Sequence, residues 1–376
     1  MRRVELPALT GVRFYAATLV FLSHVGLLPG AGKLVSDHLI FNVGVVGVSF
    51  FFVLSGFILT YNYADVFRAG VSWPSYGRFV WDRLTKIYPV HLLATLVVLP
   101  IAVYSPNLPF DWTALPVHLL LLQCFWPFAT GSRGEYLNVP SWSISCEWFF
   151  YLLAPVAMFL ALGRRRSLMP ILVAALYVVL GWFVWNGQSD ATRLHVVSWF
   201  APSRFIEFLA GVFLCRWYLA APRAGKVWSP AAVQAAGIVL IVAGAVYRDY
   251  APWPLWGGLL YLPGSAVLVF GLTRGDTVLA RHLAAPLVRR LGVASYSFYL
   301  LHAPMLRALK SVFLVTGSEV GSWAAFGALA AVTFVAIQVT ALIVCSAYEL
   351  PVQKRLRDLV RKRTVGNLGG VPQPVS

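Results

Sequence analysis

Acidic residues are scarce in this sequence of 376 residues, which has 14 Asp and Glu against 30 Lys and Arg. Charged residues of both signs make up only 12% of the chain, whereas hydrophobic residues make up 59%. A soluble globular domain is about one quarter charged, so the composition excludes that class. The apolar residues occur in runs of about twenty, the length of a helix that crosses a bilayer. The sequence therefore predicts an integral membrane protein.

Cysteine is also rare, and no cysteine pattern typical of a metal site is present. The four cysteines, at positions 124, 146, 215 and 345, lie in or beside apolar runs without CxxC or zinc-finger spacing. We expect buried thiols that pack like small apolar side chains. A disulfide between Cys124 and Cys146 is the alternative if both face an oxidising compartment. The sequence carries no cofactor fingerprint, so we expect no bound metal and no bound cofactor.

Ten apolar runs are long enough to span a membrane. They cover residues 8–29, 43–63, 87–104, 142–162, 168–186, 199–219, 229–247, 253–273, 292–315 and 322–347. A weaker run, 112–128, is interrupted by Pro116 and His118 and ends in Pro127. Its length and composition alone do not decide whether it crosses the membrane.

The positions of the cations decide how this weaker run is placed. If the ten runs span and the amino terminus is cytoplasmic, 22 of the 30 Lys and Arg lie in inner segments, as the positive-inside rule requires. A crossing at 112–128 would move the Arg164–Arg166 cluster outside. We therefore predict an all-α polytopic membrane protein with about ten transmembrane helices, both termini cytoplasmic, and 112–128 re-entrant or interfacial. The net charge of +16 then reflects topology, and no nucleic acid is expected as a partner.

The loops between the runs are short, which favours one membrane-embedded domain. We expect this domain to cover residues 1–350 and residues 351–376 to form a basic cytoplasmic tail that is disordered toward its end. The first run resembles a signal peptide, but it is long and contains Arg13 and His24. A cleaved leader has no use for such residues, so we expect this run to stay in the protein.

Ionisable side chains inside membrane spans are costly unless they pair or face a cavity, so each is a candidate functional residue. Arg13 and His24 are eleven residues apart in the first run, which is about three helical turns and a rise of about 16 Å. One helix face would thus carry a cation near the cytoplasmic end and a titratable base in the outer third. The alternative is that Arg13 reaches lipid headgroups while His24 pairs within the structure.

A second group of cations, Arg78, Arg83 and Lys86, meets the membrane at the start of the third run. Such a cluster either binds lipid headgroups and sets topology, or binds a phosphate-bearing ligand from the cytoplasm.

Two further candidates lie in other spans. Glu147 is predicted one or two turns below the outer surface, close to the depth of His24. A carboxylate beside an imidazole can orient it and raise its basicity, although Glu147 could instead pair with Arg204. His302 lies in the middle of another span.

Six motifs occur in one order along residues 6 to 305: LPALTGVRFYAATLVFLSH, FFVLSGFILT, RLTKIYPVH, PSWSISCEWFFYLLAP, SRFIEFLAGVF and YSFYLLHAP. In this ordered set the chain resembles the acyltransferase 3 family of ten-helix membrane O-acyltransferases. The resemblance implies an enzyme that moves an acyl group, commonly acetyl, from cytoplasmic acyl-CoA to a hydroxyl of a sugar or glycosylated compound. It also implies a multi-pass protein of the bacterial cytoplasmic membrane.

The resemblance assigns roles to individual residues. His24 matches the histidine regarded as catalytic in the family, and Arg13, Arg83 and Lys86 match residues tied to donor handling or site structure. The family commonly has Arg at both positions of its paired cation motif. This chain has Arg83 with Lys86, and Lys keeps the charge but loses the bidentate phosphate geometry of Arg.

These observations lead to one hypothesis for the reaction. Acyl-CoA is a co-substrate whose phosphates meet the inner cations, and His24 is the general base for the acceptor hydroxyl. Glu147 orients His24 or the acceptor. Direct attack on the thioester and an acyl-histidine intermediate both fit the sequence. We expect four further residues to contact substrate: Tyr15, Trp142, Ser141 and His302. Of these, Tyr15 and Trp142 offer an aromatic surface for a sugar.

Two other classes of protein are alternatives. Intramembrane Arg, His and Glu also mark solute pathways in transporters, although the sequence shows no inverted repeat of the kind that many transporters have. A membrane glycosyltransferase would need an outer-loop carboxylate, for which Asp37 is the candidate. Besides acyl-CoA, we expect a carbohydrate or glycosylated acceptor and membrane lipids as partners.

Overall fold

The computed structural model describes residues 4–29, 43–104, 112–125, 137–163, 168–186, 190–220, 229–250, 258–316, 320 and 322–367. Every regular element in these ranges is helical. Asp37, His38 and the Arg164–Arg166 cluster lie outside them. The prediction of an all-α protein is confirmed.

Nine helices in the described part of the chain are long and apolar enough to cross a membrane. They are built on α1 (Pro7–His24), α3 (Gly44–Phe67), α4 (Trp73–Tyr104), α6 (Ser141–Leu162), α7 (Leu168–Trp185), α9 (Ala201–Ala220), α10 (Pro230–Tyr247), α14 (Ser295–Thr316) and α15 (Trp323–Val344). Shorter helices connect them: α5 (Ala114–Leu119), α8 (Asp190–Ser198), α11 (Leu262–Leu272), α12 (Val278–Ala284) and α13 (Pro286–Val293). A polar helix of 18 residues, α16 (Leu350–Asn367), follows α15. The protein is a polytopic membrane protein.

Nine of the ten predicted runs coincide with these long helices. The tenth run, 253–273, contains α11, which has 11 residues, and residues 253–257 before it lie outside the described ranges. The weaker run forms α5, which has 6 residues, followed by a 3-10 turn at Gln123–Phe125. A helix of that length is far too short to cross a bilayer, as the charge distribution predicted. The side on which each terminus lies stays a prediction.

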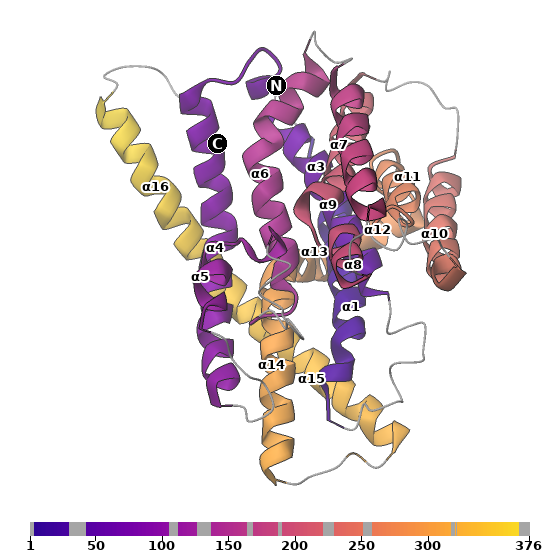
Figure 1. Ribbon diagram of the computed structural model, residues 1–376, viewed down its shortest axis with the longest axis vertical. Helices are drawn as coiled ribbons and strands as arrows, with labels where there is room; N and C mark the ends of the chain where they lie inside the picture. The colour runs from indigo at the N-terminus through magenta and orange to yellow at the C-terminus, as the bar shows by residue number, and fades with distance from the viewer. Residues whose placement is uncertain are drawn as a thin grey trace.

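Helix α3 lies at the centre of the bundle and packs against α1, α6, α9 and α11 (Figure 1). Its closest approach is to α9, where two glycines meet the opposite backbone. A Cβ added at Gly56 would lie 2.0 Å from the carbonyl oxygen of Phe208, and one added at Gly211 would lie 2.0 Å from that of Val53. Small residues allow this kind of backbone contact between membrane helices.

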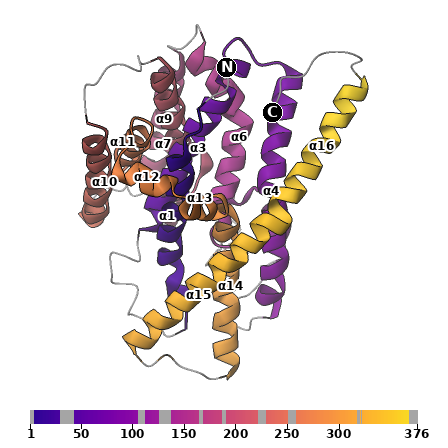
Figure 2. The same cartoon turned by 180° about the vertical axis from the view of Figure 1, so that it is seen from behind.

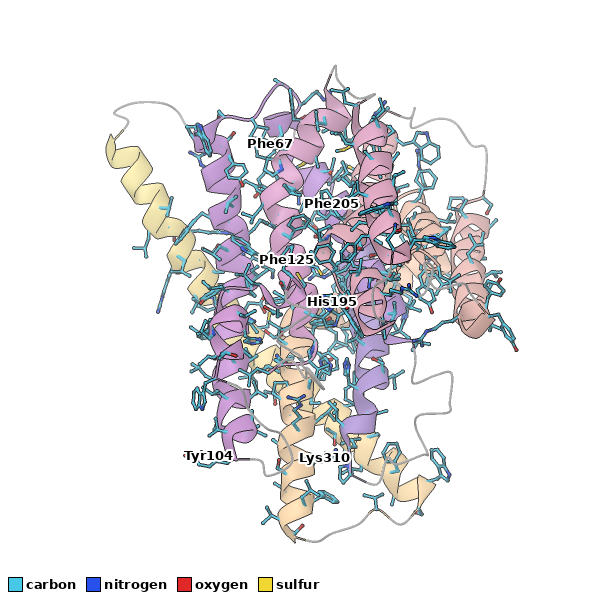
Figure 3. The ribbon with its side chains drawn as sticks, in the orientation of Figure 1. Phe67, Tyr104, Phe125, His195, Phe205 and Lys310 are labelled. Carbon is cyan, nitrogen blue, oxygen red and sulfur yellow. The ribbon has the colours of Figure 1, made fainter. Side chains whose placement is uncertain are left out.

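Aromatic side chains fill much of the space between the central helices (Figure 3). Phe67 and Phe205 are buried in this core, whereas Tyr104 lies exposed at the end of α4. The peripheral helices are different. Only 6% of the residues in the apolar stretch of α7, and 17% of those in α10, are buried inside the protein. Both helices therefore present most of their apolar surface to lipid.

A long rod crosses one side of the bundle. It consists of α15, a π-helical turn at Cys345–Glu349, and α16 (Figure 2). The rod passes α14 and α4, and Arg357 of α16 is 3.5 Å from Asp82 of α4. The segment predicted as a basic tail is therefore helical as far as Asn367. Residues 368–376, where disorder is expected, lie outside the described ranges.

Candidate active site

His24, the last residue of α1, lies against His302 of α14. Its Nδ1 atom is 2.8 Å from the carbonyl oxygen of Val20 and 3.2 Å from Nε2 of His302. A carbonyl oxygen only accepts hydrogen bonds, so we assign the ring proton to Nδ1, which donates to Val20. In the neutral ring, Nε2 then carries the lone pair. This is the tautomer that a general base at Nε2 requires.

The two histidines are not equivalent. His302 is fully buried and its ring stacks on Phe298 at 6.1 Å between centroids, whereas His24 is partly exposed. The ring centroids of His24 and His302 are 5.0 Å apart. His302 therefore supports the ring of His24 from inside the protein. The sequence placed both residues in spans but gave no signal that they touch.

Arg13 of α1 and Glu147 of α6 line one small cavity of about 40 Å³, together with Phe52, Ser143 and other residues of α3, α6 and α14. Glu147 accepts a hydrogen bond of 3.1 Å from the Tyr151 hydroxyl. The Nε atom of Arg13 is buried and has no hydrogen-bond partner among the described residues. An unsatisfied guanidinium donor beside a cavity is suited to a ligand that carries oxygen acceptors.

The predicted contact between Glu147 and His24 is not formed as a hydrogen bond within the described residues. The side chain of Glu147 bonds to Tyr151, and that of His24 to Val20, Ser23 and His302. The orienting role of Glu147 stays a prediction.

The alternative pairing of Glu147 with Arg204 is not formed either. Arg204 donates from Nε and Nη2 to the two carboxylate oxygens of Glu207 at 2.6 and 3.0 Å. Both residues are almost completely buried. This pair is not among the sequence predictions, although a spacing of three residues on one helix is a signal for it.

Arg83 and Lys86 lie one turn apart on α4. Arg83 donates to the Tyr63 hydroxyl at 3.4 Å, and its guanidinium lies 5.7 Å from the Tyr63 ring centroid. Its Nε is buried without a hydrogen-bond partner among the described residues. Arg83 thus has unused hydrogen-bonding capacity.

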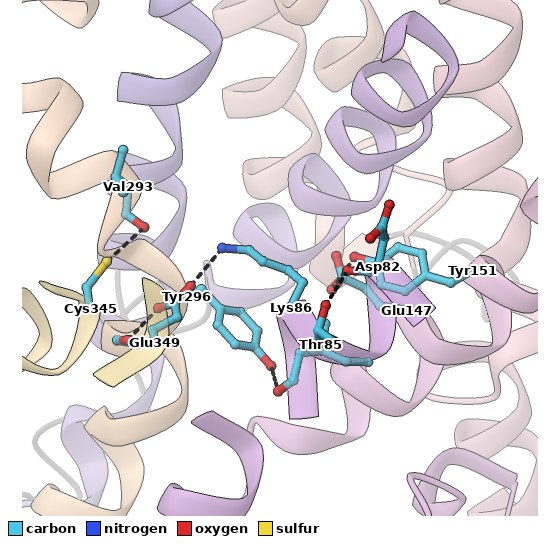
Figure 4. Close-up of polar contacts among 11 residues, drawn as sticks. Asp82, Thr85, Lys86, Glu147, Tyr151, Val293, Tyr296, Cys345 and Glu349 are labelled. Atoms are coloured by element: carbon cyan, nitrogen blue, oxygen red, sulfur yellow. Dashed lines mark hydrogen bonds and ion pairs between the residues drawn. The ribbon is translucent and has the colours of Figure 1, made fainter. Parts of the chain in front are cut away.

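Lys86 is committed to a carboxylate that the sequence reasoning did not single out. Its Nζ is 2.7 Å from Oε1 of Glu349, and the Oε2 atom of Glu349 accepts a 2.7 Å hydrogen bond from Ser297 (Figure 4). Glu349 is 1% exposed and Lys86 is 24% exposed. Glu349 lies in the π-helical turn of the rod. Such turns are frequent at functional sites, but periodicity in the sequence does not reveal them.

The other three candidates lie in separate surroundings. The Tyr15 hydroxyl is 2.6 Å from Nε2 of His282 on α12, and the Tyr15 side chain is exposed. Trp142 is buried, with the Arg204 guanidinium 5.4 Å from its ring centroid. Ser141 is buried at the start of α6, donates to Asn138 and lies 3.4 Å from Nδ1 of His118. Trp142 and Ser141 hold the start of α6 in place, and substrate contact by these three residues stays a prediction.

Arg13 and Glu147 thus share one cavity, and His24 pairs with His302 at the end of α1 outside the lining of that cavity. That the three groups act together in one reaction stays a prediction. The sequence profile of the acyltransferase 3 family, described as an acyltransferase domain, matches residues 6–342. The chain belongs to this family and is a membrane O-acyltransferase. The transporter and glycosyltransferase alternatives are thereby set aside.

Individual relatives agree with this assignment. Acyltransferase MdmB of Streptomyces mycarofaciens is 30% identical, over 100% of this chain and 97% of its own. Exopolysaccharide production protein ExoZ of Rhizobium meliloti is 29% identical, over 88% and 95%. Peptidoglycan O-acetyltransferase OatA of Listeria monocytogenes is 24% identical over 89% of this chain, which covers 54% of the relative. No solved structure matches the chain.

The pairing of Lys86 with Glu349 leads to a prediction about stability. Glu349→Gln removes a charged acceptor from a buried position, so we expect a loss of about 1.5–3 kcal/mol of unfolding free energy. The double variant Lys86→Gln, Glu349→Gln should lose less than the sum of the two single variants, because neither is left with an unpaired charge. Thermal unfolding of the purified variants in detergent measures both effects.

The exposed pair Arg281–Asp276, at 3.3 Å, is the matched control. Asp276→Asn should change the unfolding free energy by less than about 1 kcal/mol. Equal effects at Glu349 and Asp276 would show that the buried ion pair has no special role.

Proposed function

We propose that this protein transfers an acyl group, with acetyl-CoA as its donor, to a hydroxyl of a carbohydrate-type acceptor in the bacterial cytoplasmic membrane. His24 is the general base. The observation that carries the proposal is the position of the His24 ring, whose Nδ1 atom lies 2.8 Å from the Val20 carbonyl oxygen and 3.2 Å from Nε2 of His302.

The reaction needs one proton acceptor and one proton donor, and His24 supplies both in turn. Nε2 takes the proton of the acceptor hydroxyl while the hydroxyl oxygen attacks the thioester carbon. The carbon–sulfur bond then breaks, and the imidazolium returns the proton to the departing CoA thiolate. The Val20 carbonyl keeps the proton on Nδ1 throughout and stabilises the charged ring. The same ring could carry an acyl group at Nε2, and direct transfer is the simpler of the two routes.

Donor binding is assigned to the cations of α1 and α4. Arg83 and Arg13 each retain a buried Nε donor without a partner among the described residues, and guanidinium groups match phosphate geometry. Lys86 is neutralised by Glu349 at 2.7 Å, so we assign it a supporting role that fixes α4 against the rod. This division of roles between Arg83 and Lys86 is consistent with the sequence, in which Lys86 stands where the family commonly has Arg.

The size of the Arg13–Glu147 cavity bears on how substrates enter. Its volume of about 40 Å³ has room for one or two water molecules, whereas ligand sites are commonly about 300–1,000 Å³. His24 is not among the residues that line this cavity, so the proposal requires the helices around the cavity to move apart before a donor bound at Arg13 can extend to His24. Glu147 then orients the acceptor or the ring as the cavity opens.

The acceptor class is inferred from the relatives. One is named as an exopolysaccharide production protein and another as a peptidoglycan O-acetyltransferase. Both names point to saccharides, so we propose a saccharide hydroxyl as the nucleophile.

The role of His24 leads to the first test. His24→Ala should lower the acyl-transfer rate by roughly 10²–10⁴-fold, because the hydroxyl loses its base. The assay follows radiolabel from acetyl-CoA to saccharide in membranes, with protein level and thermal stability checked in parallel. Val332→Ala shortens an exposed side chain on α15 and should retain most of the activity. Full activity in folded His24→Ala would exclude the proposed base.

The donor assignment leads to a second test. Arg83→Ala removes a guanidinium with one 3.4 Å hydrogen bond, so we expect the KM for acetyl-CoA to rise by about tenfold or more, in line with about 1.5–3 kcal/mol for a charged hydrogen bond. Initial rates at varied acetyl-CoA concentration measure it. The exposed Arg281→Ala is the matched control, and an unchanged KM in Arg83→Ala would remove Arg83 from the donor site.

A further inference from the structure

A second cavity, of about 680 Å³, lies between α7, α8 and α9. Most of its wall is apolar, including Leu180, Val184, Val196 and Leu259. Its volume falls within the range of about 300–1,000 Å³ that is common for small-molecule sites. The reaction proposed above does not use this cavity.

One helix forms the outer wall of this cavity. The α7 residues that line it are Tyr177, Leu180, Gly181, Val184 and Trp185. They follow the spacing i, i+3, i+4, i+7, i+8 and therefore share one face of the helix. Most of the rest of α7 is exposed, since only 6% of the residues in its apolar stretch are buried. A ligand can thus enter from the bilayer.

The wall on α9 supplies hydrogen-bond donors. The Ser203 Oγ atom is buried without a hydrogen-bond partner among the described residues. A guanidinium has five N–H donors, and Arg204 uses four of them, on Glu207, Ser49 and the carbonyl of Ser198. One Nη1–H is left. The cavity therefore combines an apolar body with a polar wall on α9, formed by Ser203, Arg204 and Glu207.

This cavity adjoins the candidate active site. The Arg204 guanidinium lies 5.3 Å from the ring centroid of Phe52, and Phe52 lines the small cavity that contains Arg13 and Glu147. Arg204 thus lines one cavity and stacks on a residue that lines the other. A layer one or two side chains thick separates the two spaces.

We propose that the cavity between α7, α8 and α9 binds the hydrocarbon chain of a membrane amphiphile, with the oxygen-bearing end of that molecule at Ser203 and Arg204. The bilayer around α7 supplies such molecules, and the side chains of Ser203 and Arg204 on the cavity wall can donate to ester, phosphate or hydroxyl oxygens once they turn toward the ligand. The amphiphile is either a bulk phospholipid or a lipid-linked acceptor. The second source rests on the proposed function, whereas the binding site itself does not.

The test uses phosphatidylglycerol that carries a diazirine in one acyl chain. The probe is added to the purified full-length protein in detergent and photolysed, and the labelled peptides are mapped by mass spectrometry. We expect saturable labelling within residues 177–185 and 196–207, which excess unlabelled phosphatidylglycerol removes. Labelling that does not saturate would overturn the proposal, because it would report general exposure to lipid.

A blocking variant sharpens the test. A Cβ added at Gly181 meets nothing within 4 Å, so Gly181→Trp places an indole in the cavity without a clash at Cβ. We expect saturable labelling to fall by about tenfold, or about 1.4 kcal/mol. Gly327 on α15 has the same open surroundings, and Gly327→Trp should label like the wild type. Val184→Trp blocks the same space if Gly181→Trp does not fold. Unchanged labelling in a folded blocking variant would overturn the proposal.

A competition arm identifies the source of the amphiphile. If a polyprenyl-phosphate-linked saccharide displaces the probe and Gly181→Trp raises the KM for that acceptor alone, the site holds the acceptor's chain. If the probe is not displaced, the site holds bulk phospholipid, and both results support a chain-binding site. The labelling requires no turnover, so a failure of the proposed reaction leaves its outcome interpretable.

Discussion

The cost of placing an ionisable side chain in a bilayer is the constraint on which this structure depends. Each such group must pair, or face a cavity where a ligand can complete its bonds. The structure shows both solutions. Arg204 and Glu207 pair at 2.6 Å, and Lys86 and Glu349 pair at 2.7 Å. Arg13, by contrast, keeps an unsatisfied donor beside a cavity.

This difference separates structural from chemical roles among residues that look alike in the sequence. Paired groups hold helices together: Lys86 fixes α4 to the rod, and Arg204 joins α9 to Ser49 of α3 at 3.1 Å. Groups with unused bonds are the ones available to substrates. His24 belongs to this second class, because its Nδ1 is occupied by Val20 while the lone pair on Nε2 is left for a proton. The proposed chemistry follows from what the packing leaves unpaired.

Much of the fold could be predicted from the sequence, because span length and the positive-inside rule act on local composition. The short helix α5 in place of a crossing at 112–128 is the clearest case. The site was predicted only as a set of residues. Its contacts depend on how helices rotate and cross, which periodicity does not specify. The His24–His302 contact is an example, as is the π-helical turn that directs Glu349 toward Lys86.

The most direct test of the central claim is a structure of the protein in a lipid nanodisc with a non-hydrolysable acetyl-CoA analogue. The account predicts that the cavity at Arg13 and Glu147 opens and that the analogue's carbonyl carbon lies beside Nε2 of His24. The space between the carbonyl carbon and Nε2 should admit one acceptor hydroxyl, with the reacting atoms about 3–3.5 Å apart. Nδ1 should remain bonded to Val20. An acyl group bound away from His24, or a ring turned so that Nδ1 faces the carbonyl carbon, would contradict the account.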